Sequence, residues 1–276
     1  MNTTPSHPTI TFIGGGNMAS AIVGGLLRQG HPASVLQIVE PWDEQRSKLA
    51  QQFPGVSLLA AASAELRPSD LVVWAVKPQT FKDAALASQP YLQGALHLSV
   101  AAGITSESMA GWLQTQRIVR AMPNTPALVG LGMTGLFARD GASATDRALV
   151  ETVVKTTGDL VWVASERDLD AVTAISGSGP AYVFYFLEAM RDAGTRMGLP
   201  PEVAYQLAVG TFIGASTLAQ RSDDPPQTLR ERVTSKGGTT YAALTSMEAA
   251  GVKAKFEEAL FAAQKRAEEL GREFGK

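Results

Sequence analysis

The feature that most constrains this chain is a glycine-rich turn close to its N-terminus. The letters IGGGNMA at residues 13–19 follow a short β-rich run at residues 9–13 and open a segment, residues 17–29, with apolar residues at helical spacing. This is the G-x-G-x-x-A dinucleotide fingerprint in its strand–turn–helix context. Gly14 permits the tight turn, and Gly16 lets the backbone approach a pyrophosphate at the helix N-terminus. The turn predicts a nucleotide-binding α/β domain; the alternative is a turn that only connects a strand to a helix.

One acidic residue stands where such a domain recognises the ribose of its nucleotide. Glu40 lies 24 residues after Gly16, just past an expected strand at residues 36–39. An acid at this place hydrogen-bonds the ribose 2′-hydroxyl of NAD and repels the 2′-phosphate of NADP. Arg46 lies six residues further on and could serve a 2′-phosphate instead. The position of Glu40 favours NADH, unless this residue only ends a strand.

Short apolar runs and helix-like segments alternate over the first half of the chain. Further strands are expected at residues 70–76, 97–100 and 117–120, and helices at residues 43–52, 81–88 and 106–113. The nearly continuous apolar run at residues 70–76 is typical of a strand covered on both faces of a parallel sheet. Alternating units with short connections predict a Rossmann-like, doubly wound parallel sheet of the α/β class.

The character of the sequence changes near residue 165. Residues 132–137 and 160–163 could add edge strands, but beyond them strand signals stop and the chain becomes Ala-rich. Helical patterns occupy residues 180–197, 202–220, 227–233, 241–250 and 252–273. We therefore predict a dinucleotide-binding domain over residues 1–165 and an all-α domain for dimerisation and substrate binding over residues 166–276.

Composition excludes several classes of function. The chain has no cysteine, so disulfides, thiolate metal sites and a cysteine nucleophile are excluded, and its three histidines are scattered, so we expect no metal site. The net charge of −2 does not suggest a nucleic-acid surface. No apolar stretch reaches the length of a membrane span, and residues 1–8 lack the pattern of a signal peptide, so we expect no membrane contact and a cytoplasmic location.

Four separated stretches of the chain resemble the pyrroline-5-carboxylate reductase family. They are FIGGGNMA at residues 12–19, AVKPQ at residues 75–79, VRAMPNTPA at residues 119–127 with SGSGPAY at residues 176–182, and VTSKGGTT at residues 233–240. The first two stretches are shared with related dehydrogenases, whereas the last two are specific. Their occurrence in this order over nearly the whole chain carries the resemblance.

The resemblance implies an enzyme that reduces 1-pyrroline-5-carboxylate, a cyclic imine, to L-proline with NADH or NADPH, the last step of proline biosynthesis. Loops that end parallel strands lie at the edge of the sheet where ligands bind. The resemblance places the loops at residues 76–78 and 120–126 against the cofactor. The alternatives are an ordinary strand-to-loop transition for the first and a rigid structural turn for the second. The expected cofactor-binding residues are Gly14, Gly15, Gly16, Asn17, Met18, Glu40, Val76, Lys77, Pro78, Ala102 and Asn124.

The loop at residues 234–240 offers consecutive amides and hydroxyls ahead of a helix, a natural cradle for a carboxylate. The resemblance implies that amides around Gly238 and Thr239 hold the substrate carboxylate. Thr240 would hydrogen-bond the ring nitrogen and Ser235 would shape the loop, so these two are the expected catalytic residues. The alternative is a plain helix cap.

Two further residues bear on the substrate site. The resemblance places Glu166 where the family carries an acidic residue near the substrate. The chain departs from the family at Lys236, where proline is usual, and this departure either adds positive charge near an anionic ligand or is neutral.

Residues 181–187 are apolar around most of a helix, and such a helix needs burial on all sides. The resemblance implies an intertwined homodimer and permits a decamer built from dimers, whereas an intramolecular core is equally consistent with the pattern alone. Two other functions remain open. A β-hydroxyacid dehydrogenase needs a catalytic lysine, for which Lys253 and Lys255 are the distant candidates. A non-catalytic nicotinamide sensor would not need the loop at residues 234–240.

Overall fold

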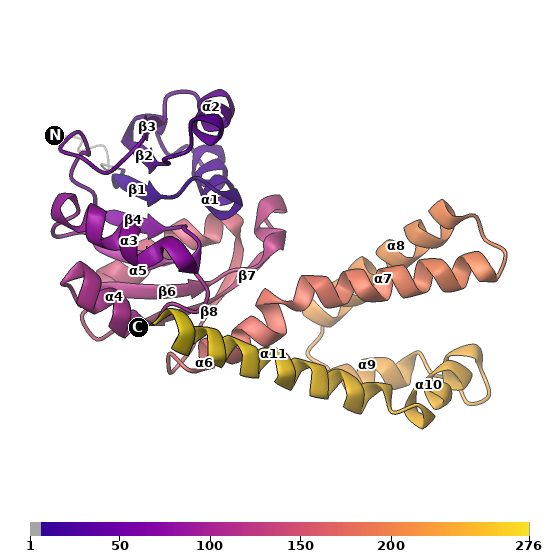
Figure 1. Cartoon of the computed structure of the whole chain (residues 1–276). Helices are drawn as coiled ribbons and strands as arrows, with labels where there is room; N and C mark the ends of the chain where they lie inside the picture. The colour runs from indigo at the N-terminus through magenta and orange to yellow at the C-terminus, as the bar shows by residue number, and fades with distance from the viewer. Residues whose placement is uncertain (1–6, 276) are drawn as a thin grey trace. The chain divides into compact units, whose positions relative to one another are not determined.

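The computed structural model describes residues 7–275, and residues 1–6, which bear on the expected absence of a signal peptide, lie outside that range. The chain divides into two compact units (Figure 1). The first comprises Met1–Ser178 together with Ala263–Lys276, and the second comprises Gly179–Ala262. The expected domain boundary near residue 165 stays a prediction, because a compact unit and a functional domain need not share a boundary.

The first unit is built on one eight-stranded sheet with the order β3-β2-β1-β4-β5-β6-β7-β8. The strands are β1 (Ile10–Ile13), β2 (Leu36–Val39), β3 (Ser57–Leu59), β4 (Leu71–Trp74), β5 (Leu96–Ser99), β6 (Ile118–Met122), β7 (Gly132–Ala138) and β8 (Gly158–Trp162). Every residue of β1, β2, β4 and β5 is buried, because these central strands are covered on both faces. The predicted doubly wound sheet is therefore confirmed.

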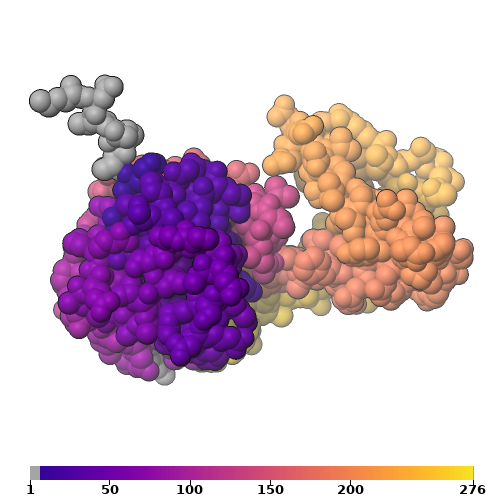
Figure 2. All heavy atoms as spheres, turned by 90° about the horizontal axis from the view of Figure 1, so that it is seen from above, coloured from indigo at the N-terminus to yellow at the C-terminus, as the bar shows by residue number. Residues whose placement is uncertain are grey.

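Helices cover the sheet in two layers, each with its own apolar cluster. One cluster contains side chains of α1 (Asn17–Arg28), α2 (Asp43–Gln52) and α5 (Ala144–Val154). The other contains side chains of α3 (Pro78–Ser88) and α4 (Ser106–Leu113). In the space-filling view this unit, from indigo to magenta, is a closely packed body (Figure 2). Short helical segments complete it: η1 (Ala33–Val35), η2 (Gln89–Tyr91), η3 (Thr125–Val129), η4 (Lys155–Thr157), α6 (Asp168–Val172) and η5 (Thr173–Gly177).

The sheet departs from a purely parallel arrangement at one pair of strands. β7 runs antiparallel to β6, and β8 then pairs parallel to β7. The connection between β6 and β7 contains only η3, which is shorter than the dozen or more residues that a parallel crossover requires. β3, α5 and α6 were not expected from the sequence.

The second unit is helical and has little core of its own. Its helices are α7 (Gly179–Arg196), α8 (Pro201–Gln220), α9 (Pro226–Arg232), α10 (Thr239–Ala249) and the first part of α11 (Val252–Phe274), whose last turns belong to the first unit. Only Leu187, Gly194, Ala204 and Ala208 are buried on α7 and α8, and none on α9 or α10. Within residues 7–275, no helix combines the length and apolarity needed to cross a bilayer.

Candidate active site

The glycine turn after β1 leaves its backbone open to a ligand. Gly14 has φ +93°, and a Cβ there would lie 2.7 Å from the carbonyl oxygen of Ala75, so only glycine fits. A Cβ on Gly16, by contrast, would meet nothing within 4 Å. Gly16 is also the N-cap of α1, with no side chain capping the helix. The first amides of α1 are thus available for an anion, and the turn fits the pyrophosphate of a dinucleotide.

Glu40 is held rigidly beside this turn. Its Oε2 accepts a hydrogen bond from the Gly15 amide (2.9 Å), and its Oε1 accepts one from the Trp42 amide (3.1 Å). Gln45 fixes the turn from the other side, since its Nε2 donates to the Gly15 carbonyl (2.7 Å). The guanidinium of Arg46 donates to the Glu40 carbonyl (2.7 Å) and pairs with a neighbouring carboxylate of α2. Carboxylate and guanidinium are therefore both fixed by local contacts.

The other expected cofactor residues follow β4, β5 and β6, in the same unit as the glycine turn. Lys77 has an extended backbone (φ −66°, ψ 147°) and is the N-cap of α3, which begins at Pro78, three residues before the expected start of the helix. Ala102 lies in the loop between β5 and α4. Asn124 follows β6, but its amide group is already bonded: Nδ2 donates to the Ser176 hydroxyl (3.1 Å) and Oδ1 accepts from the Met133 amide (2.9 Å). A cofactor contact by Asn124 stays a prediction.

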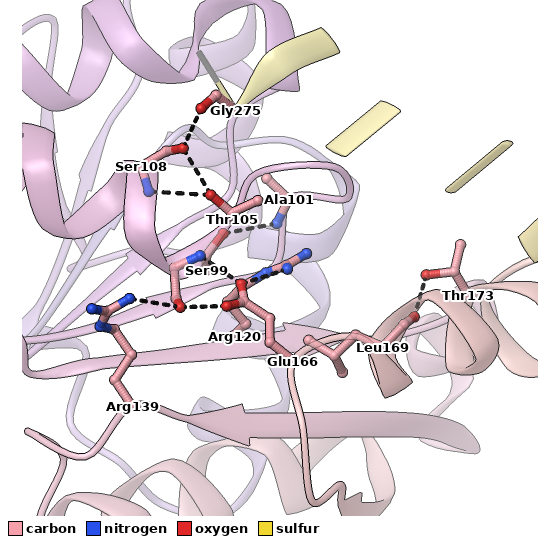
Figure 3. Close-up of polar contacts among 11 residues, drawn as sticks. Ser99, Ala101, Thr105, Ser108, Arg120, Arg139, Glu166, Leu169, Thr173 and Gly275 are labelled. Carbon is pink, nitrogen blue, oxygen red and sulfur yellow. Dashed lines mark hydrogen bonds and ion pairs between the residues drawn. The ribbon is translucent and has the colours of Figure 1, made fainter. Parts of the chain in front are cut away.

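Glu166 is the centre of a polar cluster within the first unit (Figure 3). Its Oε1 accepts from the Ser106 amide (2.6 Å) and from Nη1 of Arg120 (2.8 Å), and its Oε2 accepts from the Ser106 hydroxyl (2.6 Å). The same hydroxyl receives a hydrogen bond from Arg139 (3.1 Å). Both carboxylate oxygens are thus engaged by protein groups, which suits a residue that positions other segments. Contact with the substrate stays a prediction.

The electrostatics of this cluster favour a charged Glu166. Burial opposes the charge, but the hydrogen bonds from Ser106 and the positive charge of Arg120 outweigh burial and hold the pKa of Glu166 below its usual value. The Arg120 side chain is 11% exposed, and its Nε is buried with no hydrogen-bond partner among residues 7–275. The ion pair therefore supplies most of what stabilises this buried guanidinium.

The expected substrate loop lies in the second unit. Gly237 has φ +77°, and the Gly238 amide donates to the Ser235 carbonyl (3.0 Å), which closes a turn ahead of α10. Gly238 is the N-cap of α10 and no side chain caps the helix, so the amides of its first turn, from Thr239 and Thr240, are available for an anion. No hydrogen bond within residues 7–275 engages the hydroxyls of Ser235, Thr239 or Thr240. The loop is thus a set of unused donors at a helix N-terminus.

Sequence reasoning missed two residues that shape the site. Gln45 holds the glycine turn, yet on the sequence it is one of many polar residues in a solvent-facing helix. Ser106 joins Glu166 to the start of α4, and on the sequence it is only the first residue of an expected helix. Both contacts join residues far apart in sequence, 30 and 60 positions, which no local pattern reveals.

Two family models cover most of the chain. The one described as pyrroline-5-carboxylate reductase dimerisation matches residues 166–270. The one described as NADP oxidoreductase, coenzyme F420-dependent, matches residues 9–103. The first match contains the loop at residues 234–240, and the second contains the glycine turn and Glu40.

Full-length relatives agree with the family models. A pyrroline-5-carboxylate reductase from Pseudomonas aeruginosa is 43% identical, over 98% of this chain and 99% of the relative. The solved structure of a pyrroline-5-carboxylate reductase from Coxiella burnetii matches with a TM-score of 0.89 at 36% identity, covering 96% of this chain and 99% of the other. A pyrroline carboxylate reductase from Plasmodium falciparum, solved with NADP bound, matches with a TM-score of 0.85 at 29% identity, covering 96% and 98%.

These matches do not indicate the β-hydroxyacid dehydrogenase that the glycine turn alone left open. Their identity and coverage extend over both units, including the loop that distinguishes the two classes. The chain belongs to the pyrroline-5-carboxylate reductase family, with an N-terminal NAD(P)-binding domain and a C-terminal helical dimerisation domain.

Proposed function

We propose that this protein reduces 1-pyrroline-5-carboxylate to L-proline with a reduced nicotinamide cofactor, the last step of proline biosynthesis. The observation that carries the proposal is the N-terminus of α10, where no cap engages the amides of Thr239 and Thr240 and no hydrogen bond within residues 7–275 engages the hydroxyls of Ser235, Thr239 and Thr240. Such a helix start suits a small ligand with a carboxylate and one hydrogen-bonding ring atom. Full-length relatives of the same name support the assignment.

The chain's own residues bind and orient the reactants. The amides that follow Gly238 at the start of α10, those of Thr239 and Thr240, hold the substrate carboxylate, and the Thr240 hydroxyl orients the ring nitrogen. Ser235 fixes the shape of the turn through its carbonyl, which accepts the Gly238 amide. The bound dinucleotide supplies the hydride for the imine carbon, and holding two reactants in reactive geometry contributes roughly 7–11 kcal/mol to lowering a barrier. A protonated imine accepts a hydride readily, so the loop needs no strong acid.

We propose NADH as the preferred cofactor. Glu40 offers a fixed carboxylate to a ribose 2′-hydroxyl, whereas a 2′-phosphate would face that negative charge. Arg46, the cation nearest to this place in sequence, is already bonded to the Glu40 carbonyl and paired with Asp43. The relative solved with NADP bound is 29% identical, so its cofactor is not transferred to this chain.

The proposal is tested by following cofactor oxidation with 1-pyrroline-5-carboxylate, using NADH and NADPH in separate runs. We expect turnover with both and a higher kcat/KM with NADH. The Thr240→Ala variant should lose about 10-fold or more in kcat/KM, because a hydrogen bond to the reacting ring is removed.

The matched control is Thr152→Ala on α5, where a helix hydroxyl bonded to the Ala148 carbonyl (2.9 Å) is removed instead. This variant should keep full activity. Absence of turnover with either cofactor would favour the non-catalytic sensor. A Thr240→Ala variant with unchanged kcat/KM would remove Thr240 from the mechanism.

A further inference from the structure

Trp42 differs from the other tryptophans of the chain in having no protein partner for its ring. Its side chain is 74% exposed, and among residues 7–275 the indole has no stacking ring, no cation over its face and no hydrogen-bond partner. Trp74 is fully buried and donates to His97, while Arg147 stacks on Trp162 and Lys82 on Trp112. An exposed aromatic ring directly after the polar residues of the candidate cofactor site is placed to pack against a bound ligand.

The backbone of Trp42 is fixed to the nucleotide site. Its amide donates to Oε1 of Glu40 (3.1 Å), and Oε2 of the same carboxylate accepts from the Gly15 amide (2.9 Å). One carboxylate thus bridges the phosphate turn and Trp42. Trp42 is also the N-cap of α2, with an extended backbone that ends the loop after β2. Trp42 is therefore fixed close to the Glu40 carboxylate, the group proposed to bind the ribose.

The charges around Trp42 select a neutral ligand. Glu40 lies on one side in sequence, and Asp43 and Glu44 follow directly, with side chains 91% and 83% exposed. Two nearby cations, Arg46 and Lys48, pair with these two acids. An anionic group such as a second phosphate would be repelled here, whereas an uncharged, flat heterocycle gains from stacking on an indole.

We infer that Trp42 provides the aromatic face on which the adenine ring of the cofactor stacks. In a dinucleotide the adenine is joined directly to the ribose whose hydroxyls Glu40 would bind, so the base is the part of the ligand next to Trp42. The inference rests on the proposed cofactor site and adds a residue to it. The dinucleotide fingerprint itself does not include this position.

The test separates the adenine half of the cofactor from the nicotinamide half. Dissociation constants for NADH and for reduced nicotinamide mononucleotide, which lacks adenine, are measured by calorimetry on the full-length protein. Trp42→Ala should weaken NADH binding about 10-fold, because stacking of a base on an aromatic side chain contributes that order of affinity. Binding of the mononucleotide should not change. Trp42→Phe should retain most of the NADH affinity.

The control variant is Tyr91→Ala, which removes another exposed aromatic ring, 43% exposed, from η2 in the same unit. It should bind both ligands like the unaltered protein. Tryptophan fluorescence gives a second readout that does not depend on the Ala variant folding. ADP-ribose should quench the unaltered protein, and Trp42→Phe should lose that quenching while it still binds NADH.

Two outcomes would overturn the inference. One is unchanged NADH affinity in Trp42→Ala, and the other is an equal loss of affinity for NADH and for the mononucleotide, which would mean that Trp42 acts through the fold. Turnover of 1-pyrroline-5-carboxylate is measured separately. If that reaction fails while ADP-ribose still quenches Trp42, the proposed function is wrong and the adenine contact stands.

Discussion

His97 and Trp74 form a buried polar pair across β4 and β5. The two strands are neighbours, and Nε1 of Trp74 donates to Nδ1 of His97 (3.0 Å). Burial, aided by the positive charge of Arg117, lowers the pKa of His97 to about 4. The imidazole is therefore neutral near pH 7 and accepts a hydrogen bond inside the sheet. His97 therefore has a structural role within the sheet.

This histidine makes stability depend on pH. Its folded pKa of about 4 lies below the ordinary value of 6.5, so the unfolded chain takes up the proton first. The stabilisation is complete above pH 6.5 and is lost as the pH falls towards 4. Between pH 7.5 and pH 5 the loss from this group should be about 2 kcal/mol. Urea unfolding of the unaltered protein and of His97→Gln at both pH values measures it, since the glutamine side chain does not titrate.

The Gln variant should be less stable at pH 7.5 and should lose less stability on acidification. Equal losses in the two proteins would mean that the fold does not lower the pKa of His97.

The role of a single residue can be predicted from the sequence where a local pattern determines that role. The glycine turn and Glu40 were found because the fingerprint fixes their spacing from one strand end. His97, Gln45 and Ser106 were not found, because each acts through a partner that only the folded sheet brings near. Trp42 lies two residues after Glu40 in the sequence, but it matches no motif.

The Glu166 side chain makes polar contacts with two elements of the first unit. It contacts the start of α4 through Ser106 and the middle of β6 through Arg120, while it lies itself ahead of α6. The last turns of α11 contact the same region, since the Ser108 hydroxyl donates to the Gly275 carbonyl (2.6 Å). This cluster fixes the beginning of α4, and with it the loop that contains Ala102.

Removing Glu166 should therefore destabilise the first unit. Glu166→Ala leaves the guanidinium of Arg120 buried without its ion pair, and we expect a loss of about 2–3 kcal/mol, less than for a fully buried pair because Glu166 is 25% exposed. Glu107→Ala is the matched control: its carboxylate pairs with Arg139 but is 82% exposed, so the loss should stay below about 0.5 kcal/mol.

Urea unfolding of the two variants measures the difference, and steady-state kinetics on the same samples separates the two roles of Glu166. An Ala variant of ordinary stability with a raised KM for the imine would assign Glu166 to the substrate, as the sequence predicts.

Most elements could be predicted from periodicity, and those that could not have physical reasons. α7 to α11 carry regular patterns, and the observed bounds differ from the expected ones by at most two residues. β3 is three residues long and only half buried, so no apolar run marks it. β7 runs antiparallel to β6 because the connection that contains η3 is short. The sequence shows the length of this connection, but not the direction in which β7 pairs.

Many large apolar side chains of the second unit are exposed in a single chain. Large side chains such as Phe184, Tyr185, Ile213, Leu218 and Phe261 are each 59% to 69% exposed. A surface of this kind is stable in water only when another chain covers it, and for a homodimer the same surface occurs on both partners. The family model for this region is itself a dimerisation domain. The helical half is therefore completed by a second copy of the chain.

Folding and association should accordingly be one process. A charge on the apolar surface, introduced by the double variant Phe184→Glu and Ile213→Glu, should convert the dimer to monomer and lower the melting temperature. Melting of the unaltered protein should rise with protein concentration, because a dimer is favoured by mass action, and melting of the double variant should not. Sedimentation velocity combined with thermal unfolding at several concentrations measures both effects.

The control is Leu86→Glu, which places the same charge on an exposed apolar side chain of α3 in the first unit, 52% exposed. This variant should sediment like the unaltered protein. The same sedimentation run reads out whether dimers assemble into a decamer, as the resemblance to the family permits. A double variant that stays dimeric would mean that α7 and α8 do not form the interface, and the apolar surface of the second unit would then need another partner.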